Sequence, residues 1–368
     1  MIKKIKAKQY IEEIKPYKQG LSSVKKELIE VIKLSSNENA LGSSFKAKEA
    51  YKKHSEDLSR YADGNCLELR EAIGSKYKID SQRIVCGSGS DEIISLLVQA
   101  FAGEGDEIIY SQYGFLMYPI SAQKFGVKAI AAKEDSLTTN IDNILGLINN
   151  KTKMIFIANP NNPTGSYIGK DQIQKLIDKT PKDIVIVLDL AYNEFVNKKM
   201  ADYVDVISLV NENDNVVMSR TFSKIYGLAS LRLGWSYSSR YITETLNKNR
   251  GPFNVTGAAM EAGIAAVQDD DFIQKSVDHN NFWLSKLNMQ LNIIGLKTHP
   301  SMANFILIDF LNKDKCQRAN QFLLENGVIL RDLSSYKLDK CLRMTIGTEY
   351  ENLKVIKLLE KFQENDSI

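Results

Sequence analysis

The chain has 368 residues, of which 43% are hydrophobic and 25% charged, and its net charge is +3. Basic and acidic residues are interspersed, so the composition argues against a nucleic-acid partner, and no apolar run suits a transmembrane helix or a signal peptide. The cysteines (Cys66, Cys86, Cys316 and Cys341) form no CxxC pair and have no histidines at ligand spacing. We therefore expect a cytoplasmic protein with reduced thiols, no metal and no membrane partner.

The length leaves room for a sizeable core and two domains. Residues 1–35 are typical of an N-terminal arm, which carries Tyr17 after a short amphipathic segment. We expect residues 36–270 to form a large domain and residues 271–368 a small α+β domain against which the arm packs. Asn37, at the entry to the large domain, is a candidate turn residue.

Short β-branched runs alternate with helical patterns through the large domain. The predicted strands are 84–86, 107–110, 128–130, 153–158, 184–188, 215–219 and 233–237. This alternation predicts an α/β fold with a mostly parallel, seven-stranded central sheet and helices on both faces. In such sheets, ligands gather at the carboxyl ends of the strands.

Two polar loops follow predicted strands. Ser88, Gly89 and Ser90 lie in a glycine-bearing loop that opens a helical pattern, and the free N–H groups of a helix N-terminus can receive a phosphate. Asn162 lies in the turn after strand 153–158. Both loops are therefore expected at the ligand-binding edge of the sheet.

Asp189 ends the apolar strand at 184–188, and Tyr192 follows three residues later. A buried carboxylate is costly unless it is paired. A pyridinium nitrogen is a natural partner, since Asp189 would keep it protonated and the ring could then accept electrons. Phe115, after the second strand, would suit stacking on a planar ring, although a core aromatic is nearly as good an interpretation.

The stretch from 219 to 234 carries Thr221, Ser223, Lys224 and Arg232. Two hydroxyls and a guanidinium suit a phosphate, because all three donate hydrogen bonds and Arg does so bidentately. Lys224 beside them could form a Schiff base with an aldehyde on the same ligand. Taken alone, the pattern is equally that of a solvated turn.

A long helix is predicted from about 240 to 275, with a break at Pro252. Asn254, beside the break, would be a cap or a substrate contact. Beyond this helix, the expected helices are 272–289, 317–326 and 349–362, and the expected strands are 305–309, 328–331 and 341–346.

Arg331 and Arg343 fall in apolar strands, where a fixed charge needs a partner. That partner is either an anionic ligand or a structural salt bridge. The histidines (His54, His279 and His299) are expected at the surface or at an interface.

The four polar stretches occur in the order of fold-type-I pyridoxal-phosphate aminotransferases. The chain resembles most closely the histidinol-phosphate aminotransferases of class II, from Ile14 to Glu349. The resemblance implies a homodimer with pyridoxal 5′-phosphate as cofactor, held by Lys224 as an internal aldimine. It also implies ping-pong transamination of L-histidinol phosphate with 2-oxoglutarate in histidine biosynthesis, with freed Lys224 moving the proton.

The same resemblance implies a role for each candidate residue. Asp189 would hold the pyridinium proton, Phe115 would stack on the ring, and Tyr192 with Asn162 would donate to its phenolic oxygen. The substrate would meet Tyr17, Asn162, Arg331 and Arg343. The phosphate of the cofactor would be anchored by Ser88, Gly89, Ser90, Thr221, Ser223, Arg232 and, from the partner subunit, Tyr61.

The chain departs from the family at Leu190, where the usual residue is Glu, and the effect of that change is left open. Tyr61 could also be a half-buried aromatic of its own subunit. Aromatic-amino-acid aminotransferases and threonine-phosphate decarboxylases resemble this chain as well. A non-catalytic regulator built on the same fold is disfavoured, because the chain has no segment resembling a DNA-binding module and retains Lys224, Asp189 and Arg232.

Overall fold

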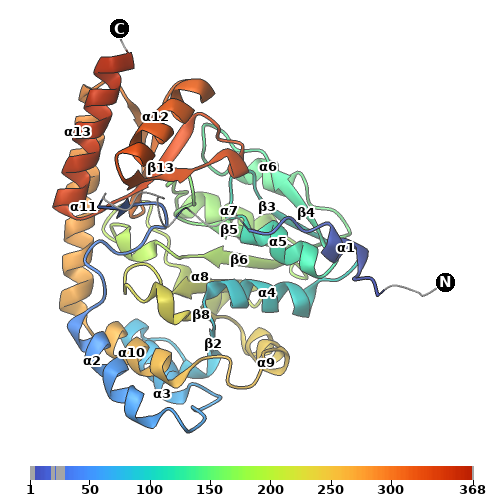
Figure 1. Cartoon of the computed structure of the whole chain (residues 1–368). Helices are drawn as coiled ribbons and strands as arrows, with labels where there is room; N and C mark the ends of the chain where they lie inside the picture. Colours follow the sequence, from blue (N-terminus) through green and yellow to red (C-terminus); the bar gives the residue numbers. More distant parts are fainter. Residues whose placement is uncertain (1–4, 18–20, 22–29, 367–368) are drawn as a thin grey trace.

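The computed structural model describes residues 5–17, 21 and 30–366. Its largest feature is a seven-stranded sheet with the strand order β2-β8-β7-β6-β5-β3-β4 (Figure 1). Neighbouring strands from β7 to β4 are parallel, and β8 runs antiparallel to both β7 and β2. The strands are β2 (Ile84–Gly87), β3 (Glu107–Ser111), β4 (Lys128–Ala132), β5 (Thr152–Ala158), β6 (Val185–Asp189), β7 (Val216–Thr221) and β8 (Gly234–Tyr237). The predicted mostly parallel sheet is confirmed.

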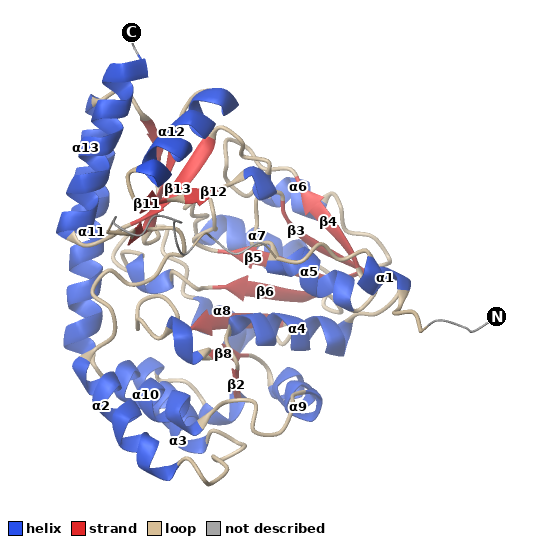
Figure 2. Ribbon diagram, viewed as in Figure 1, coloured by secondary structure: helices blue, strands red, loops and turns tan. Residues whose placement is uncertain are grey.

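Both faces of this sheet are covered by helices (Figure 2). In β6, Val185 and Val187 join one apolar cluster, whereas Ile186 and Leu188 join another on the opposite face. This is why the strand reads as a continuous apolar run rather than an alternating one. The first cluster includes residues of α4 (Ser90–Phe101), α5 (Met117–Lys124) and α9 (Arg240–Asn249). The second includes residues of α3 (Leu67–Tyr77), α6 (Ile141–Leu145), α7 (Lys170–Lys179), α8 (Val206–Glu212) and α10 (Gly257–Val267).

A smaller, antiparallel sheet has the strand order β12-β13-β10-β9. These strands are β9 (Lys297–His299), β10 (Phe305–Asp309), β12 (Arg331–Asp332) and β13 (Cys341–Thr345). A separate apolar cluster joins this sheet to α11 (Asp270–Ile293), α12 (Lys313–Glu325) and α13 (Glu349–Asp366). The predicted domain boundaries before residues 36 and 271 stay a prediction.

Two expected elements of the C-terminal half are wrong in detail. The strand predicted at 328–331 is two strands in different sheets, because β11 (Val328–Ile329) pairs with β1 (Ile32–Lys33) while β12 pairs with β13. The long helix predicted from about 240 to 275 is interrupted at Pro252 as expected, between α9 and α10, but a second break, which was not predicted, separates α10 from α11. Thr256, not Asn254, accepts a hydrogen bond from the N-terminus of α10.

The shorter elements are α1 (Gln9–Glu12), α2 (Phe45–His54), and the 3₁₀ turns Ser55–Asp57, Ser81–Arg83, Asn193–Phe195, Ala229–Leu231 and Ser334–Tyr336. The N-terminal arm meets the C-terminal half through β1, which adds a parallel partner to β11. Leu34 extends this contact, because its N–H donates to the Ile329 carbonyl and its own carbonyl accepts from Thr345.

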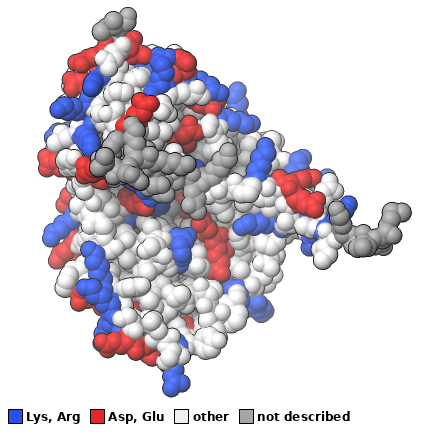
Figure 3. Space-filling view, viewed as in Figure 1, with Lys and Arg blue, Asp and Glu red and all other residues white. Residues whose placement is uncertain are grey.

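On the face shown in Figure 3, basic and acidic side chains are interspersed over the surface. Within residues 5–17, 21 and 30–366, no helix combines the length and the apolar character needed to cross a membrane.

Candidate active site

A cavity of about 430 Å³ lies where β5, β6 and β7 end, bounded by Ala158, Asp189 and Thr221. The structure brings most of the predicted site residues together around it. The predicted residues that line the cavity are Tyr17, Ser90, Phe115, Asn162, Asp189, Tyr192, Thr221, Ser223, Lys224, Arg232, Arg331 and Arg343. Ser88, Gly89 and Tyr61 do not line it.

Lys224 follows the end of β7 and is half-buried. Its Nζ donates to the Ser36 carbonyl at 3.0 Å and lies 5.8 Å from the centre of the Tyr192 ring. Burial lowers the pKa of Lys224 to about 8, and the positive charge of Arg343 adds to the effect. An amine with this pKa is partly unprotonated near neutral pH, so it can attack an aldehyde or accept a proton.

Asp189 is the last residue of β6 and is 4% exposed. Its carboxylate accepts hydrogen bonds from the Tyr118 hydroxyl at 2.8 Å and from the Ala191 N–H at 3.2 Å. Burial raises the pKa of Asp189 to about 6. A cation placed beside it would favour the charged form again, as a pyridinium would.

Tyr118 was not among the predicted site residues, although it holds Asp189. It is fully buried, and its ring stacks on Phe156 with the centres 4.7 Å apart. Its position three residues after Phe115, in the first turn of α5, was the available signal. Phe115 itself is half-buried at the cavity wall, with its ring edge-on to Tyr118.

Arg232, Ser223 and Thr221 form a cradle of hydrogen-bond donors. The Arg232 guanidinium donates to the Ser223 hydroxyl at 3.3 Å and to the Asp91 carboxylate at 3.2 Å. The Thr221 hydroxyl accepts from the Ser223 N–H at 3.1 Å. These partners hold the side chains in place beside the N-terminus of α4, where free N–H groups favour an anion.

Gly89 precedes α4 with a φ of +84°, and a Cβ there would lie 2.3 Å from the Arg232 guanidinium. The positive φ favours glycine, and any other side chain there would also displace the Arg232 guanidinium. The Ser88 N–H donates to the Glu92 carboxylate at 2.6 Å, which fixes the preceding turn. Gly89 and Ser88 therefore shape the loop without lining the cavity.

Tyr192 and Asn162 line the same cavity as this cradle. The Tyr192 hydroxyl accepts from the Asn37 side-chain amide at 2.9 Å, and burial raises the pKa of Tyr192 to about 12. The phenol therefore keeps its proton and can donate it to a ligand oxygen. Asn37 was expected only as a turn residue; it does have a positive φ of 54°, but its side chain also positions Tyr192.

Arg343 is 5% exposed on β13 and is held by neutral oxygens, the Asn162 side-chain carbonyl and the Ser35 main-chain carbonyl. Its Nε has no hydrogen-bond partner among the described residues, and burial lowers the pKa of the guanidinium. None of the ion pairs in the described part of the chain includes Arg343. Such a cation is suited to an anionic ligand.

Arg331 lines the same cavity and lies 5.8 Å from the centre of the Tyr17 ring. Two buried guanidiniums and an aromatic ring thus face the space next to Lys224. The arrangement suits a ligand that carries a second anionic group away from the reacting amine.

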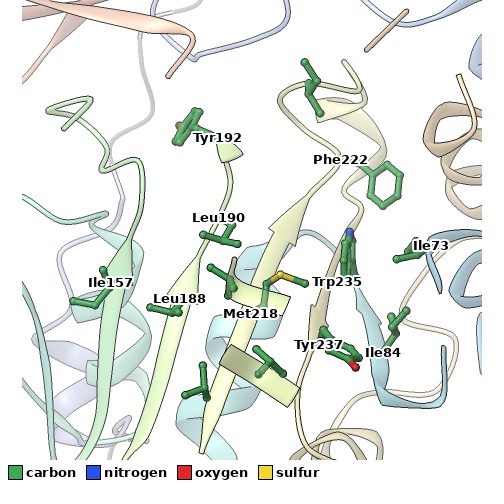
Figure 4. Close-up of a cluster of buried hydrophobic side chains, with 14 of the residues drawn as sticks. Ile73, Ile84, Ile157, Leu188, Leu190, Tyr192, Met218, Phe222, Trp235 and Tyr237 are labelled. Carbon is green, nitrogen blue, oxygen red and sulfur yellow. The ribbon is translucent and has the colours of Figure 1, made fainter. Parts of the chain in front are cut away.

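Two residues discussed from the sequence, Tyr61 and Leu190, do not line the cavity. Tyr61 is 86% exposed and stacks on Phe253 at 4.7 Å, so the interpretation of a half-buried aromatic is wrong. Leu190 is 3% exposed and points into the apolar cluster beneath β6 (Figure 4). A carboxylate at that position would be buried among apolar side chains, so the leucine suits its surroundings.

The donor set fits the cofactor expected from the sequence. The cradle offers a guanidinium and hydroxyls for a phosphate, Asp189 offers a buried carboxylate for a ring nitrogen, and Lys224 offers an amine for an aldehyde. The 430 Å³ cavity is of the size of known cofactor sites.

Comparisons of sequence place the chain among known proteins. It is 45% identical to the histidinol-phosphate aminotransferase of Paramagnetospirillum magneticum over 355 residues, which cover 96% of this chain and 97% of that protein. It is 43% identical to the histidinol-phosphate aminotransferase of Maricaulis maris, over 96% and 98% of the two chains.

Solved structures with the same fold include the histidinol-phosphate aminotransferase of Sinorhizobium meliloti in complex with pyridoxal 5′-phosphate. Its TM-score is 0.90 at 20% identity, with 99% of each chain covered. The L-threonine-O-3-phosphate decarboxylase of Porphyromonas gingivalis matches with a TM-score of 0.74 at 21% identity, over 91% of this chain and all of that one. The family model for aminotransferase class I and II matches residues 29–359, and the chain belongs to that family.

Proposed function

We propose that this aminotransferase uses pyridoxal 5′-phosphate to transaminate L-histidinol phosphate with 2-oxoglutarate, in histidine biosynthesis. The observation that carries the proposal is the pair of buried arginines, Arg331 and Arg343, in the same cavity as Lys224. The names of the 42–45% identical relatives support the choice of substrate. The bound cofactor supplies an aldehyde for the substrate amine and a ring that takes up electrons from the substrate Cα.

The residues of the chain supply binding and proton transfer. Thr221, Ser223 and Arg232 would anchor the phosphate, and Asp189 would hold the proton of the ring nitrogen. Lys224 would remove the proton from the substrate Cα, because its lowered pKa leaves part of the amine unprotonated. The Ser36 carbonyl, 3.0 Å from Nζ, would keep that amine near the cavity floor.

The arginines would serve the two substrates in turn, in a ping-pong order in which one product leaves before the second substrate binds. The phosphate of the amine donor and a carboxylate of 2-oxoglutarate are both anions, and a guanidinium binds either bidentately. Tyr17 borders this region through its contact with Arg331. A single anion pocket thus accounts for two substrates of different shape.

The test follows the visible absorption of the cofactor-loaded protein after addition of L-histidinol phosphate or L-phenylalanine. We expect rapid bleaching with histidinol phosphate and slow bleaching with phenylalanine. The Lys224→Ala variant should lose roughly 100- to 10,000-fold in rate. Equal or faster reaction with phenylalanine would instead indicate an aromatic aminotransferase, and release of carbon dioxide from threonine phosphate a decarboxylase. Lack of reaction with all three would contradict the proposed function.

We also propose a cytoplasmic homodimer in which Tyr61 reaches the cofactor phosphate of the neighbouring subunit. The exposed stack of Tyr61 on Phe253 supports this, because paired aromatics at 86% and 46% exposure are costly to leave in water. Sedimentation should give a dimer, and Tyr61→Phe should release the cofactor faster, with unchanged sedimentation. A fully active monomer would contradict the proposal.

A further inference from the structure

We propose that His299, Asp309 and Cys341 bind a single transition-metal ion of the Zn²⁺ class, at a site separate from the cavity. One ligand atom of each side chain, a histidine nitrogen, a carboxylate oxygen and the cysteine Sγ, lies within 4.8 Å of the other two. His299 is partly exposed, whereas Asp309 and Cys341 are buried. The site is therefore built from the interior of the smaller sheet and reaches solvent at one edge.

The strand register places the three side chains together. Asp309 pairs directly with Cys341 between β10 and β13, and Leu307 pairs with His299 between β10 and β9. Alternate residues of a strand share a face, so Leu307 and Asp309 point the same way, and their partners follow them. The grouping is thus fixed by hydrogen-bonded backbone on three adjacent strands rather than by a loop.

The chemistry of the ligands indicates the class of metal. One nitrogen, one sulfur and one oxygen suit Zn²⁺ and similar ions, whereas Mg²⁺ and Ca²⁺ prefer oxygen alone. The His299 Nε2 has no hydrogen-bond partner among the described residues, although it lies 3.5 Å from the Asp309 carboxylate. Three protein ligands leave a fourth, tetrahedral position for water or another ligand.

Lys340 is the group that a metal ion would have to displace. Its Nζ lies 2.9 Å from the Asp309 carboxylate, but its side chain is 53% exposed and can move into solvent. The other Asp309 oxygen accepts from the Leu311 N–H at 2.8 Å, which holds the carboxylate in place. Binding converts the Cys341 thiol to a thiolate: the S–H bond breaks, a metal–sulfur bond forms and a proton is released.

Metal binding here would cross-link three strands that also carry a residue of the cavity. Arg343 lies two positions after Cys341 on β13 and pairs with Leu307, so it shares the face of the metal ligands. We therefore expect the ion to raise the melting temperature, because it binds the folded sheet and not the unfolded chain.

The experiment titrates Co²⁺ into the cofactor-loaded enzyme without amine substrates, after treatment with a chelator. A tetrahedral Co²⁺ site with a thiolate gives intense d–d bands in the red, outside the absorption of the cofactor. We expect these bands to saturate at a single Co²⁺ per chain, to disappear on addition of Zn²⁺, and to be accompanied by an increase in melting temperature.

Matched variants separate this site from other thiols and imidazoles. Cys341→Ser and His299→Ala should lose the red bands, whereas Cys316→Ser, at another buried cysteine, and His54→Ala should retain them. His299→Ala keeps the proposal testable if Cys341→Ser does not fold. Absence of the bands in the unmodified enzyme, or their persistence in both ligand variants, would overturn the proposal, and neither result depends on turnover.

Discussion

Arg220 and Arg343 are both buried arginines on β-strands, at 4% and 5% exposure, and they have opposite surroundings. Arg220, on β7, is ion-paired with Glu194, and its guanidinium lies over the rings of Tyr77 and Trp235 at 4.5 and 5.6 Å. Arg343, on β13, meets the neutral oxygens of Asn162 and Ser35. One cation is paired with a carboxylate of the protein, whereas the other contacts neutral oxygens and the Phe305 ring, 5.2 Å from its guanidinium.

The difference is reflected in their pKa values. Burial acts to lower the pKa of Arg220, but the charge and hydrogen bond of Glu194, together with the electrostatic effects of Tyr77 and Tyr226, outweigh it, and the net shift of the pKa is upward. For Arg343 burial dominates and the pKa falls. A buried cation with its own counter-ion is part of the folded structure, and removing that counter-ion destabilises the protein. A buried cation without a counter-ion can instead bind an anionic ligand. The two arginines should therefore respond to substitution in opposite ways.

The largest expected effect is on activity. Arg343→Gln should lower kcat/KM for the anionic substrate by about 100- to 1,000-fold, since removing one partner of a buried charge pair costs roughly 3–4 kcal/mol. The melting temperature should stay the same or rise, because an uncompensated buried charge is removed. Steady-state kinetics and calorimetry of the same preparation would check both. A large loss of stability would show that Arg343 is mainly structural.

The next effect is on stability. Glu194→Gln should lower the free energy of unfolding by about 3–5 kcal/mol, because it leaves Arg220 charged and unpaired in the core. Glu49→Gln, which breaks an exposed pair with Lys52, is the matched control and should change it by less than about 1 kcal/mol. Denaturant unfolding measures both. Similar values for the two variants would show that the buried Arg220–Glu194 pair contributes no more to stability than an exposed pair.

The smallest effect is a shift in pH dependence. Only unprotonated Lys224 captures an aldehyde, so the rate of cofactor uptake by the cofactor-free protein should rise with pH and level off above about pH 8. The charge of Arg343 helps to lower the pKa of Lys224. In Arg343→Gln, the rate should therefore level off at a pH that is higher by roughly half to one unit. Arg240→Gln, at an exposed ion pair, should leave the plateau in place. An unmoved plateau in Arg343→Gln would show that the two charges do not interact.

Much of the fold could be predicted from sequence because its signals are local. Strands buried on both faces, such as β6, are continuous apolar runs, and polar residues such as Asp189 and Lys224 follow where those strands end. The strand at 328–331 was harder to predict, because its two halves differ only in their distant partners, Lys33 and Arg343.

The parts of the site that escaped prediction depend on contacts between distant segments. Tyr118 reaches Asp189 across 71 residues, and Asn37 reaches Tyr192 across 155. Neither pairing leaves a pattern in either segment. The metal ligands are similarly scattered, since His299 and Cys341 meet only through the register of three strands.

The contact of residues 34–37 with β13 affects the order in which the protein can fold during its synthesis. The Asn37 N–H donates to the Thr345 hydroxyl, 308 residues later, and the Lys224 amine is held by the Ser36 carbonyl of the same segment. Because a chain leaves the ribosome from its N-terminus, residue 345 emerges after all the strands of the large sheet, the last of which is β8. The large sheet can form earlier, but the wall of the cavity next to Lys224 requires β13. The part of the cavity next to Lys224 is therefore completed only after every strand of the large sheet has been synthesised.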